Sequence, residues 1–97
     1  SGAPKPLNLL ALARSAAGAR IAVPGTDLEV QALAERTLLE PGANCLLLVN
    51  EGRLIVDLPG GEFRVLEAGD SLMLPAATEL ALQPVAGQAV LTWHHPR

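Results

Sequence analysis

Turn-forming residues recur along most of this sequence at intervals that suit short strands. Downstream of Gly18, breaks marked by glycine or proline fall at residues 24–25, 41–42, 51–52, 59–61, 68–70, 75 and 84–87. The runs between them are short and rich in Leu and Val, which is typical of a small antiparallel sandwich or barrel. We therefore predict strands near residues 20–23, 28–38, 45–50, 53–58, 62–66, 71–74, 79–83 and 88–93, with a hairpin turn at Pro59-Gly60-Gly61.

The first residues follow a different pattern. Pro4 and Pro6 predict an extended lead-in over residues 1–6, whose Ser1-Gly2 start is typical of the remnant of a cleaved tag. Residues 7–17 have apolar side chains at helical spacing, between a capping Asn8 and a terminating Gly18. So short a helix is only marginally stable alone, so we expect it to dock on the strands. Residues 7–97 then form one domain.

Composition and charge exclude several partners. The chain has 97 residues, is 49% hydrophobic and carries a net charge of −3, with its seven basic residues scattered singly. No basic stripe is present for nucleic acid, and no apolar run is long enough to span a bilayer. Cys45 is the only cysteine, so the chain has no internal disulfide. We expect a cytoplasmic protein without a nucleic-acid or membrane partner.

The apolar residues also indicate which strands are covered. Between residues 28 and 35, apolar positions alternate with Glu29, Gln31 and Glu35, as expected for a half-exposed strand. Residues 45–49 and 72–74 are apolar at every position, so both faces of those strands should be covered. One cover is the interior of the barrel, and the other is the N-terminal helix or a second subunit.

Two blocks of sequence carry a family resemblance. The first runs from Pro41-Gly42 to Glu51-Gly52, and the second runs from Leu66 through Gly69-Asp70 to Pro75. Together they resemble the cupin superfamily, and the spacing from Gly69 to Pro75 matches its second motif. The resemblance implies an all-β fold, a small antiparallel cupin-type barrel (a double-stranded β-helix), here preceded by a short helix.

The resemblance also implies where a metal would be bound, and those positions have changed. Cupins typically place two His and a Glu in the first motif and a His in the second. Here the loop from Pro41 to Cys45 is too short for the His pair, the Glu position is Cys45, and the second His position is Leu80. The glycine expected two residues after Pro75 is Ala77. We therefore expect no metal and no other cofactor.

The same alignment predicts the lining of the barrel. If Cys45 and Leu80 point inward, the period of two in a strand turns Leu47, Val49 and Leu82 inward as well. An interior of this kind is either filled or suited to an apolar group.

Polar residues near the strand ends are candidates for a ligand site at the rim. Thr78 and Glu79 follow Pro75 at the mouth of the barrel, and Asn44, Asn50 and Arg53 flank the other strand. Trp93 could line a pocket, an interface or the core. The ligand-binding candidates are Cys45, Leu47, Arg53, Glu79, Leu80 and Trp93.

The remaining chemistry-bearing residues have a plainer interpretation. Cys45 fits a small buried hydrophobe better than a nucleophile. His94 and His95 are adjacent and point to opposite faces of a strand, so we interpret them as a polar C-terminal tail.

Three functional hypotheses follow. The leading one is a metal-free, non-enzymatic barrel that acts as a homodimeric binding or interaction module with at most a small ligand. The second is a metal-independent isomerase or lyase for a sugar-like molecule, using Glu79, Arg53 or His94. The third keeps a metal on His94, His95 or Cys45.

Overall fold

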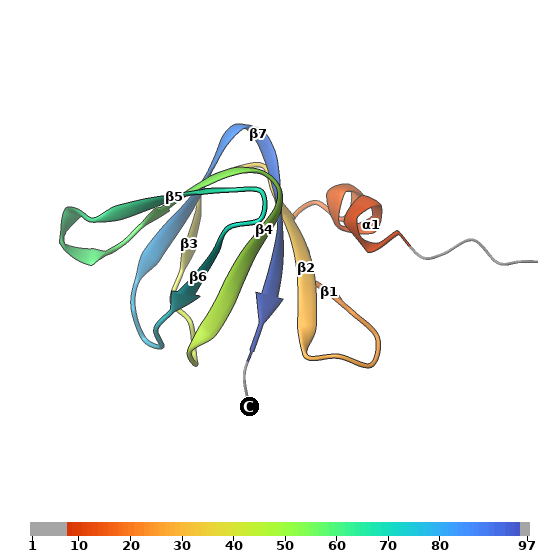
Figure 1. Ribbon diagram of the computed structural model, residues 1–97, viewed down its shortest axis with the longest axis horizontal. Helices are drawn as coiled ribbons and strands as arrows, with labels where there is room; N and C mark the ends of the chain where they lie inside the picture. The colour runs from red at the N-terminus through yellow and green to blue at the C-terminus, as the bar shows by residue number, and fades with distance from the viewer. Residues whose placement is uncertain (1–7, 96–97) are drawn as a thin grey trace, which may run out of the picture.

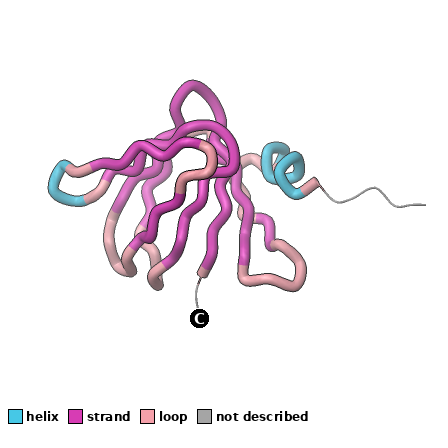
Figure 2. Tube along the Cα trace, viewed as in Figure 1, coloured by secondary structure: helices cyan, strands magenta, loops and turns pink. Residues whose placement is uncertain are grey.

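The computed structural model describes residues 8–95, in which one hydrogen-bonded set of seven strands folds over into two curved sheets that face each other and join at one end (Figure 1). The expected lead-in at residues 1–6 lies outside the described residues. The elements are helix α1 (Leu9–Ser15) and strands β1 (Ile21–Ala22), β2 (Leu28–Leu33), β3 (Thr37–Leu39), β4 (Cys45–Asp57), β5 (Phe63–Glu67), β6 (Ser71–Leu74) and β7 (Leu80–His94). Figure 2 shows how strands dominate this part of the chain. The expected small all-β barrel with a short N-terminal helix is confirmed.

Strands β4 and β7 form both sheets because each bends in its middle. Each replaces two predicted strands, 45–50 with 53–58 and 79–83 with 88–93. They pair along both halves, with register shifts between Val49 and Arg53. At the bend, Gly52 has φ +84°, and a Cβ there would lie 2.8 Å from the backbone oxygen of Gln88. The bends close one end of the molecule, at the top of Figure 1, and leave the other end open.

The chain changes sheets where one strand was predicted. Residues 28–38 divide into β2, which pairs with the last part of β7, and β3, which pairs with its first part. One sheet therefore contains β1, β2, β6 and the adjoining halves of β4 and β7, and the other contains β3, β5 and the remaining halves. The turn at Pro59–Gly61 and the end of β6 just before Pro75 agree with the sequence predictions.

Helix α1 docks on the outside of the first sheet, as expected. The Asn8 side chain accepts a hydrogen bond from the Ala11 amide at 3.0 Å, which caps the helix. Ala13 packs against Val30, Ala32 and Val90 in a small apolar cluster. The helix therefore covers one half of the outer face of this sheet. No helix within residues 8–95 is long and apolar enough to cross a membrane.

The main core fills the space between the sheets. Cys45, Leu47, Val49, Leu80 and Leu82 are each at most 3% exposed, and they belong to one cluster, as predicted from the inward-pointing positions. The same cluster includes Leu54, Leu74, Leu91 and Trp93.

Candidate functional site

The interior offers no chemistry beyond one thiol. No polar or charged side chain is buried among residues 8–95. Burial raises the pKa of the Cys45 thiol, and the nearby Arg20 partly opposes that shift. Cys45 is thus a protonated, buried side chain in the apolar core.

The three residues proposed as metal ligands do not share one site, because His94 lies apart from Cys45 and His95. Within the described part of the chain, no group of three His, Cys, Asp or Glu side chains is placed to hold a metal ion. His94 lies in a groove on the outer face of the first sheet, whereas His95 lines a pocket at the open end. The third hypothesis therefore lacks a common site for His94, His95 and Cys45.

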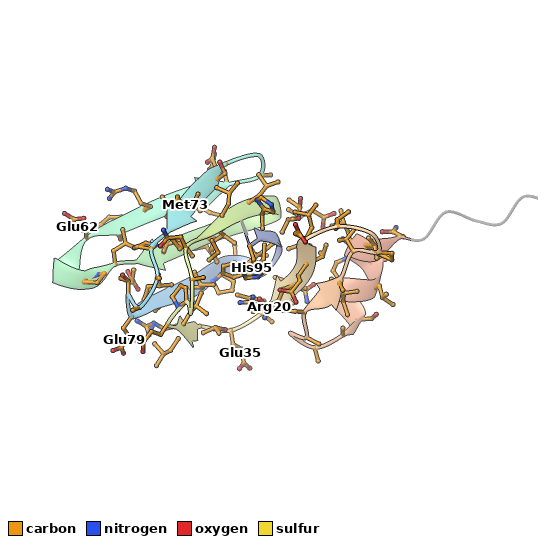
Figure 3. The ribbon with its side chains drawn as sticks, turned by 90° about the horizontal axis from the view of Figure 1, so that it is seen from below. Arg20, Glu35, Glu62, Met73, Glu79 and His95 are labelled. Carbon is orange, nitrogen blue, oxygen red and sulfur yellow. The ribbon has the colours of Figure 1, made fainter. Side chains whose placement is uncertain are left out.

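A cluster of charged side chains occupies the open end instead. Arg20, just before β1, lies beside Glu29 of β2 and His95, just after β7, and Figure 3 shows Arg20 and His95 together between the sheets. His95 Nε2 is 2.9 Å from Glu29 Oε1, and Arg20 Nη1 is 3.5 Å from the same oxygen. These three side chains are 30–41% exposed. The interpretation of His95 as part of a polar tail is wrong, because its ring is held by Glu29.

The hydrogen bonding of this cluster leaves Arg20 short of partners. His95 Nε2 must carry its proton to donate to Glu29, so it cannot also accept from Arg20 Nη1, which is 3.3 Å away. The remaining partner of Arg20 within residues 8–95 is Glu29, at a distance longer than most hydrogen bonds. Most of the guanidinium donors are therefore free of protein acceptors in this part of the chain.

Trp93 supports the cluster from the core side. The Arg20 guanidinium carbon lies 4.4 Å from the centroid of the Trp93 ring, a cation–π arrangement. The indole Nε1–H donates to Gln31 Oε1 at 2.9 Å, and Gln31 Nε2 donates to the Gly18 carbonyl at 2.7 Å. Trp93 is 1% exposed, so of the three predicted roles the core is the one it has.

The polar face of β2, which the sequence pattern predicts to be exposed to solvent, lies on the inner side of the sheet instead. Glu29 and Gln31 do share a face, but their register partners are Trp93 and Leu91, which belong to the core. That face therefore looks inward toward the open end, and the apolar face with Val30 and Ala32 packs under the helix. A polar strand face does not reveal by itself whether it meets solvent or the mouth of a barrel.

A small pocket adjoins the cluster at the open end. It has a volume of about 120 Å³ and lies between Arg20, His95 and the loop of residues 40–43, with Cys45 and Leu39 also in its wall. We call it the Arg20 pocket. It brings a cation, a carboxylate (Glu40) and apolar atoms around one opening.

The ligand site predicted at the rim does not form. Arg53 lies at the closed end and pairs with Glu67 at 2.7 Å, whereas Glu79 precedes β7 at the open end. The register partner of Arg53 is Val85, six residues beyond Glu79, so the two lie roughly 20 Å apart along the strand. Asn44 accepts a hydrogen bond from the Ala76 amide at the open end, and Asn50 donates to Thr92 on the outer face. Glu79, Arg53 and His94 therefore do not form the shared catalytic site of the second hypothesis.

The outer face of the first sheet carries an apolar groove beyond the reach of helix α1. The groove, of about 260 Å³, is lined by Leu28, Leu46, Leu48, Thr92 and His94. Met73, the register partner of Leu46, is 53% exposed beside it. We call these five lining residues the outer groove. The prediction that residues 45–49 present a second apolar face is met here, and the helix covers only part of that face.

Ala77 stands where the resemblance would place a glycine, and its backbone is left-handed. It has φ +56°, and its amide donates to the Pro41 carbonyl at 2.7 Å. An alanine therefore occupies a conformation that favours glycine.

Comparisons with solved structures support the architecture. A cupin-2 domain protein from Shewanella frigidimarina superposes with a TM-score of 0.66 at 17% identity, over 84% of this chain and 81% of the other. A protein from Neisseria meningitidis gives 0.72 at 14% identity, over 95% and 100%. The EutQ protein of Clostridium difficile gives 0.60 at 13% identity, over 68% and 47%. No family model matches the sequence, and no curated protein matches it.

At these identities the likeness establishes a fold. The neighbours include a named cupin, and the present chain has the same small antiparallel barrel, as the two sequence blocks predicted. The functional proposal depends on the residues of this chain.

Proposed function

We propose that this domain is a non-enzymatic binding module that pairs with a second copy of itself through the outer groove. The observation that carries the proposal is the contrast between a filled interior and an uncovered apolar outer face. The interior positions at which cupins hold a metal contain a buried thiol and a buried leucine, Cys45 and Leu80. A metal-free interaction domain is the function that fits those replacements.

The outer groove has the chemistry of a contact surface. Leu46 and Leu48 come from β4 and Leu28 from β2. The three side chains lie side by side on the outer face of the first sheet. Removing apolar surface of this kind from water is favourable by about 25 cal/mol per Å² buried. Helix α1 already buries the adjacent part of the face around Val30 and Val90. A second molecule would extend that burial over the remaining part.

The charge of the groove favours a second copy as its occupant. A twofold dimer brings the same patch on both subunits together, so any formal charge in the patch would meet its own kind. No Asp, Glu, Lys or Arg side chain lines the outer groove. At its edge the Thr92 hydroxyl is already paired, because it accepts a hydrogen bond from Asn50 at 2.6 Å. The face can therefore stack on itself without like-charge repulsion.

Sedimentation of three versions of the chain tests the proposal. At tens of micromolar, we expect the wild type to sediment as a dimer and Leu48→Glu to sediment as a monomer, because the new carboxylates would meet across the twofold axis. Phe63→Glu is the matched control, since Phe63 is an exposed apolar residue (58%) on a strand of the other sheet. It should stay dimeric. A monomeric wild type, or a dimer that survives Leu48→Glu, would overturn the proposal.

Elemental analysis tests the metal-free part separately. Protein purified without chelators and without a metal resin should contain well under one equivalent of any transition metal per chain. A stoichiometric metal would contradict this part of the proposal while leaving the dimer untouched.

A further inference from the structure

We infer that the Arg20 pocket binds a small α-amino acid, with its carboxylate on Arg20 and its ammonium group on Glu40. This site lies at the open end of the barrel and is separate from the outer groove. It does not depend on the proposed dimer.

The Arg20 guanidinium is positioned to receive a carboxylate. It is held over the Trp93 ring at 4.4 Å, and only its Nη1 approaches a protein acceptor within residues 8–95. The other donors form a planar fork, which matches a carboxylate in a bidentate arrangement. Because stacking on a buried indole already fixes the guanidinium, less side-chain freedom is lost on binding.

The lining of the pocket also carries the opposite charge. Glu40 lines the same pocket as Arg20, and no side-chain hydrogen bond or ion pair joins Glu40 to another residue within residues 8–95. Arg20 and Glu40 thus face one cavity without pairing to each other. A molecule with a carboxylate and an ammonium group a few ångströms apart satisfies both walls.

The charge balance separates this class of ligand from simple anions. Glu29 lies beside the guanidinium, and Glu40 lines the same pocket. A phosphate dianion or a simple carboxylate would be attracted by Arg20 but repelled by both glutamates. A zwitterion turns the Glu40 interaction from repulsive to attractive.

The size of the pocket limits the side chain. A volume of about 120 Å³ is slightly below the roughly 150 Å³ of an engineered cavity that binds benzene, a molecule of six non-hydrogen atoms. That space suits a molecule of about the same size, such as glycine or alanine. Cys45 and Leu39 provide the apolar wall for a hydrogen atom or a methyl group.

Binding can be followed by NMR at the indole Nε1–H of Trp93, because Trp93 is the only tryptophan and its ring contacts Arg20. The full chain, labelled with ¹⁵N, is titrated with alanine, propionate, ethylamine and inorganic phosphate at constant ionic strength. The indole Nε1–H signal should shift and saturate with alanine, at least tenfold more tightly than with propionate. Ethylamine and phosphate should produce no saturable shift.

Three variants assign the two contacts. Arg20→Gln should weaken alanine binding at least tenfold. Glu40→Gln, at an exposed loop position, should remove the preference for alanine over propionate while leaving the fold unchanged. Arg53→Gln is the matched control, because it removes a guanidinium at the closed end, and it should bind alanine as the wild type does.

The outcomes are separable from those of the dimer test. Absence of a saturable shift with alanine in the wild type overturns the inference. Equal binding of propionate and alanine, or a Glu40→Gln chain that keeps its preference, overturns the role of Glu40. Each variant's spectrum and unfolding midpoint are recorded first, and the Glu40→Gln result stands even if Arg20→Gln fails to fold.

Discussion

The interior of the barrel and its open end are formed by the same strands, and they have opposite chemistry. Along β7, Leu91 and Trp93 belong to the core, and His95, the second residue after Trp93, binds Glu29. On β2, Glu29 and Gln31 oppose those same core residues. The interior lacks the polar groups on which metal-binding cupins depend, whereas the open end gathers an arginine, a glutamate and a histidine from three separate segments.

Solvent access explains why charged side chains gather at the open end and not in the interior. The Arg20, Glu29 and His95 side chains keep about a third of their surface in water. Charged groups moved into the interior without full pairing would be strongly destabilised. In this chain, polar side chains that could hold a ligand gather at the mouth of the barrel. They are not found at the positions of the family motifs.

The largest expected effect comes from opening a space in the interior. Leu47→Ala should lower the free energy of unfolding by about 2–5 kcal/mol, because Leu47 is fully buried and its loss leaves a cavity. Urea unfolding followed by circular dichroism measures the change. Leu38→Ala is the control, at a residue that is 66% exposed, and should change stability by less than about 0.5 kcal/mol. A loss under about 1 kcal/mol at Leu47 would mean that the interior is loosely packed.

The second prediction concerns the closed end, where the bend at Gly52 depends on a close approach to the backbone of Gln88. Gly52→Ala should cost at least about 2 kcal/mol, since its φ is +84° and the added Cβ meets the Gln88 oxygen. Gly69→Ala has a similar φ of +94° but open space around its Cβ, so only the backbone strain of about 1–2 kcal/mol applies. Chemical denaturation measures the loss in free energy of unfolding for each variant, and the two losses are compared. Equal losses would show that the contact at Gln88 does not constrain the bend.

A smaller effect is expected at the charged cluster of the open end. Glu29→Gln removes the charge opposite Arg20 but keeps an oxygen that accepts from His95. Because these side chains are partly exposed, the loss of stability should stay below about 1 kcal/mol in thermal or urea unfolding. A loss comparable to that of Leu47→Ala would erase the distinction between the two regions.

The smallest effect, and one of opposite sign, is expected at the loop beside the open end. Ala77→Gly should stabilise the protein by up to about 1 kcal/mol, because Ala77 has φ +56° and glycine adopts that conformation without strain. Ala76→Gly is the matched neighbour, and it should destabilise slightly through the added freedom of the unfolded chain. If Ala77→Gly also destabilises, the left-handed backbone at this position is not retained in solution.

The sequence predicted the interior well, because local patterns determine it. The family resemblance pointed Cys45 and Leu80 inward, and the period of two then placed Leu47 in the core as well. The glycine and proline positions predicted the hairpin at Pro59–Gly61 and the end of β6. Spacing alone did not show that Gly52 bends one long strand, since a bend and a turn both favour glycine.

The open end could not be read from the sequence, because its members are distant along the chain. Arg20, Glu29 and His95 meet only through the pairing of β1 with β2 and of β2 with β7. That register depends on the tertiary fold, so no local motif joins the three residues. For the same reason the sequence could not show that Arg53 and Glu79, two of the ligand-binding candidates, lie at opposite ends of a strand.

The reactivity of Cys45 tests the central contrast most directly, because this thiol belongs to the core and borders the open end. It is 2% exposed, and burial raises its pKa, so little thiolate forms at neutral pH. With a thiol reagent such as 5,5′-dithiobis(2-nitrobenzoic acid), the native chain should react at least about a hundredfold more slowly than the chain in urea, because reaction requires opening of the core. A native rate close to the unfolded rate would contradict a filled interior.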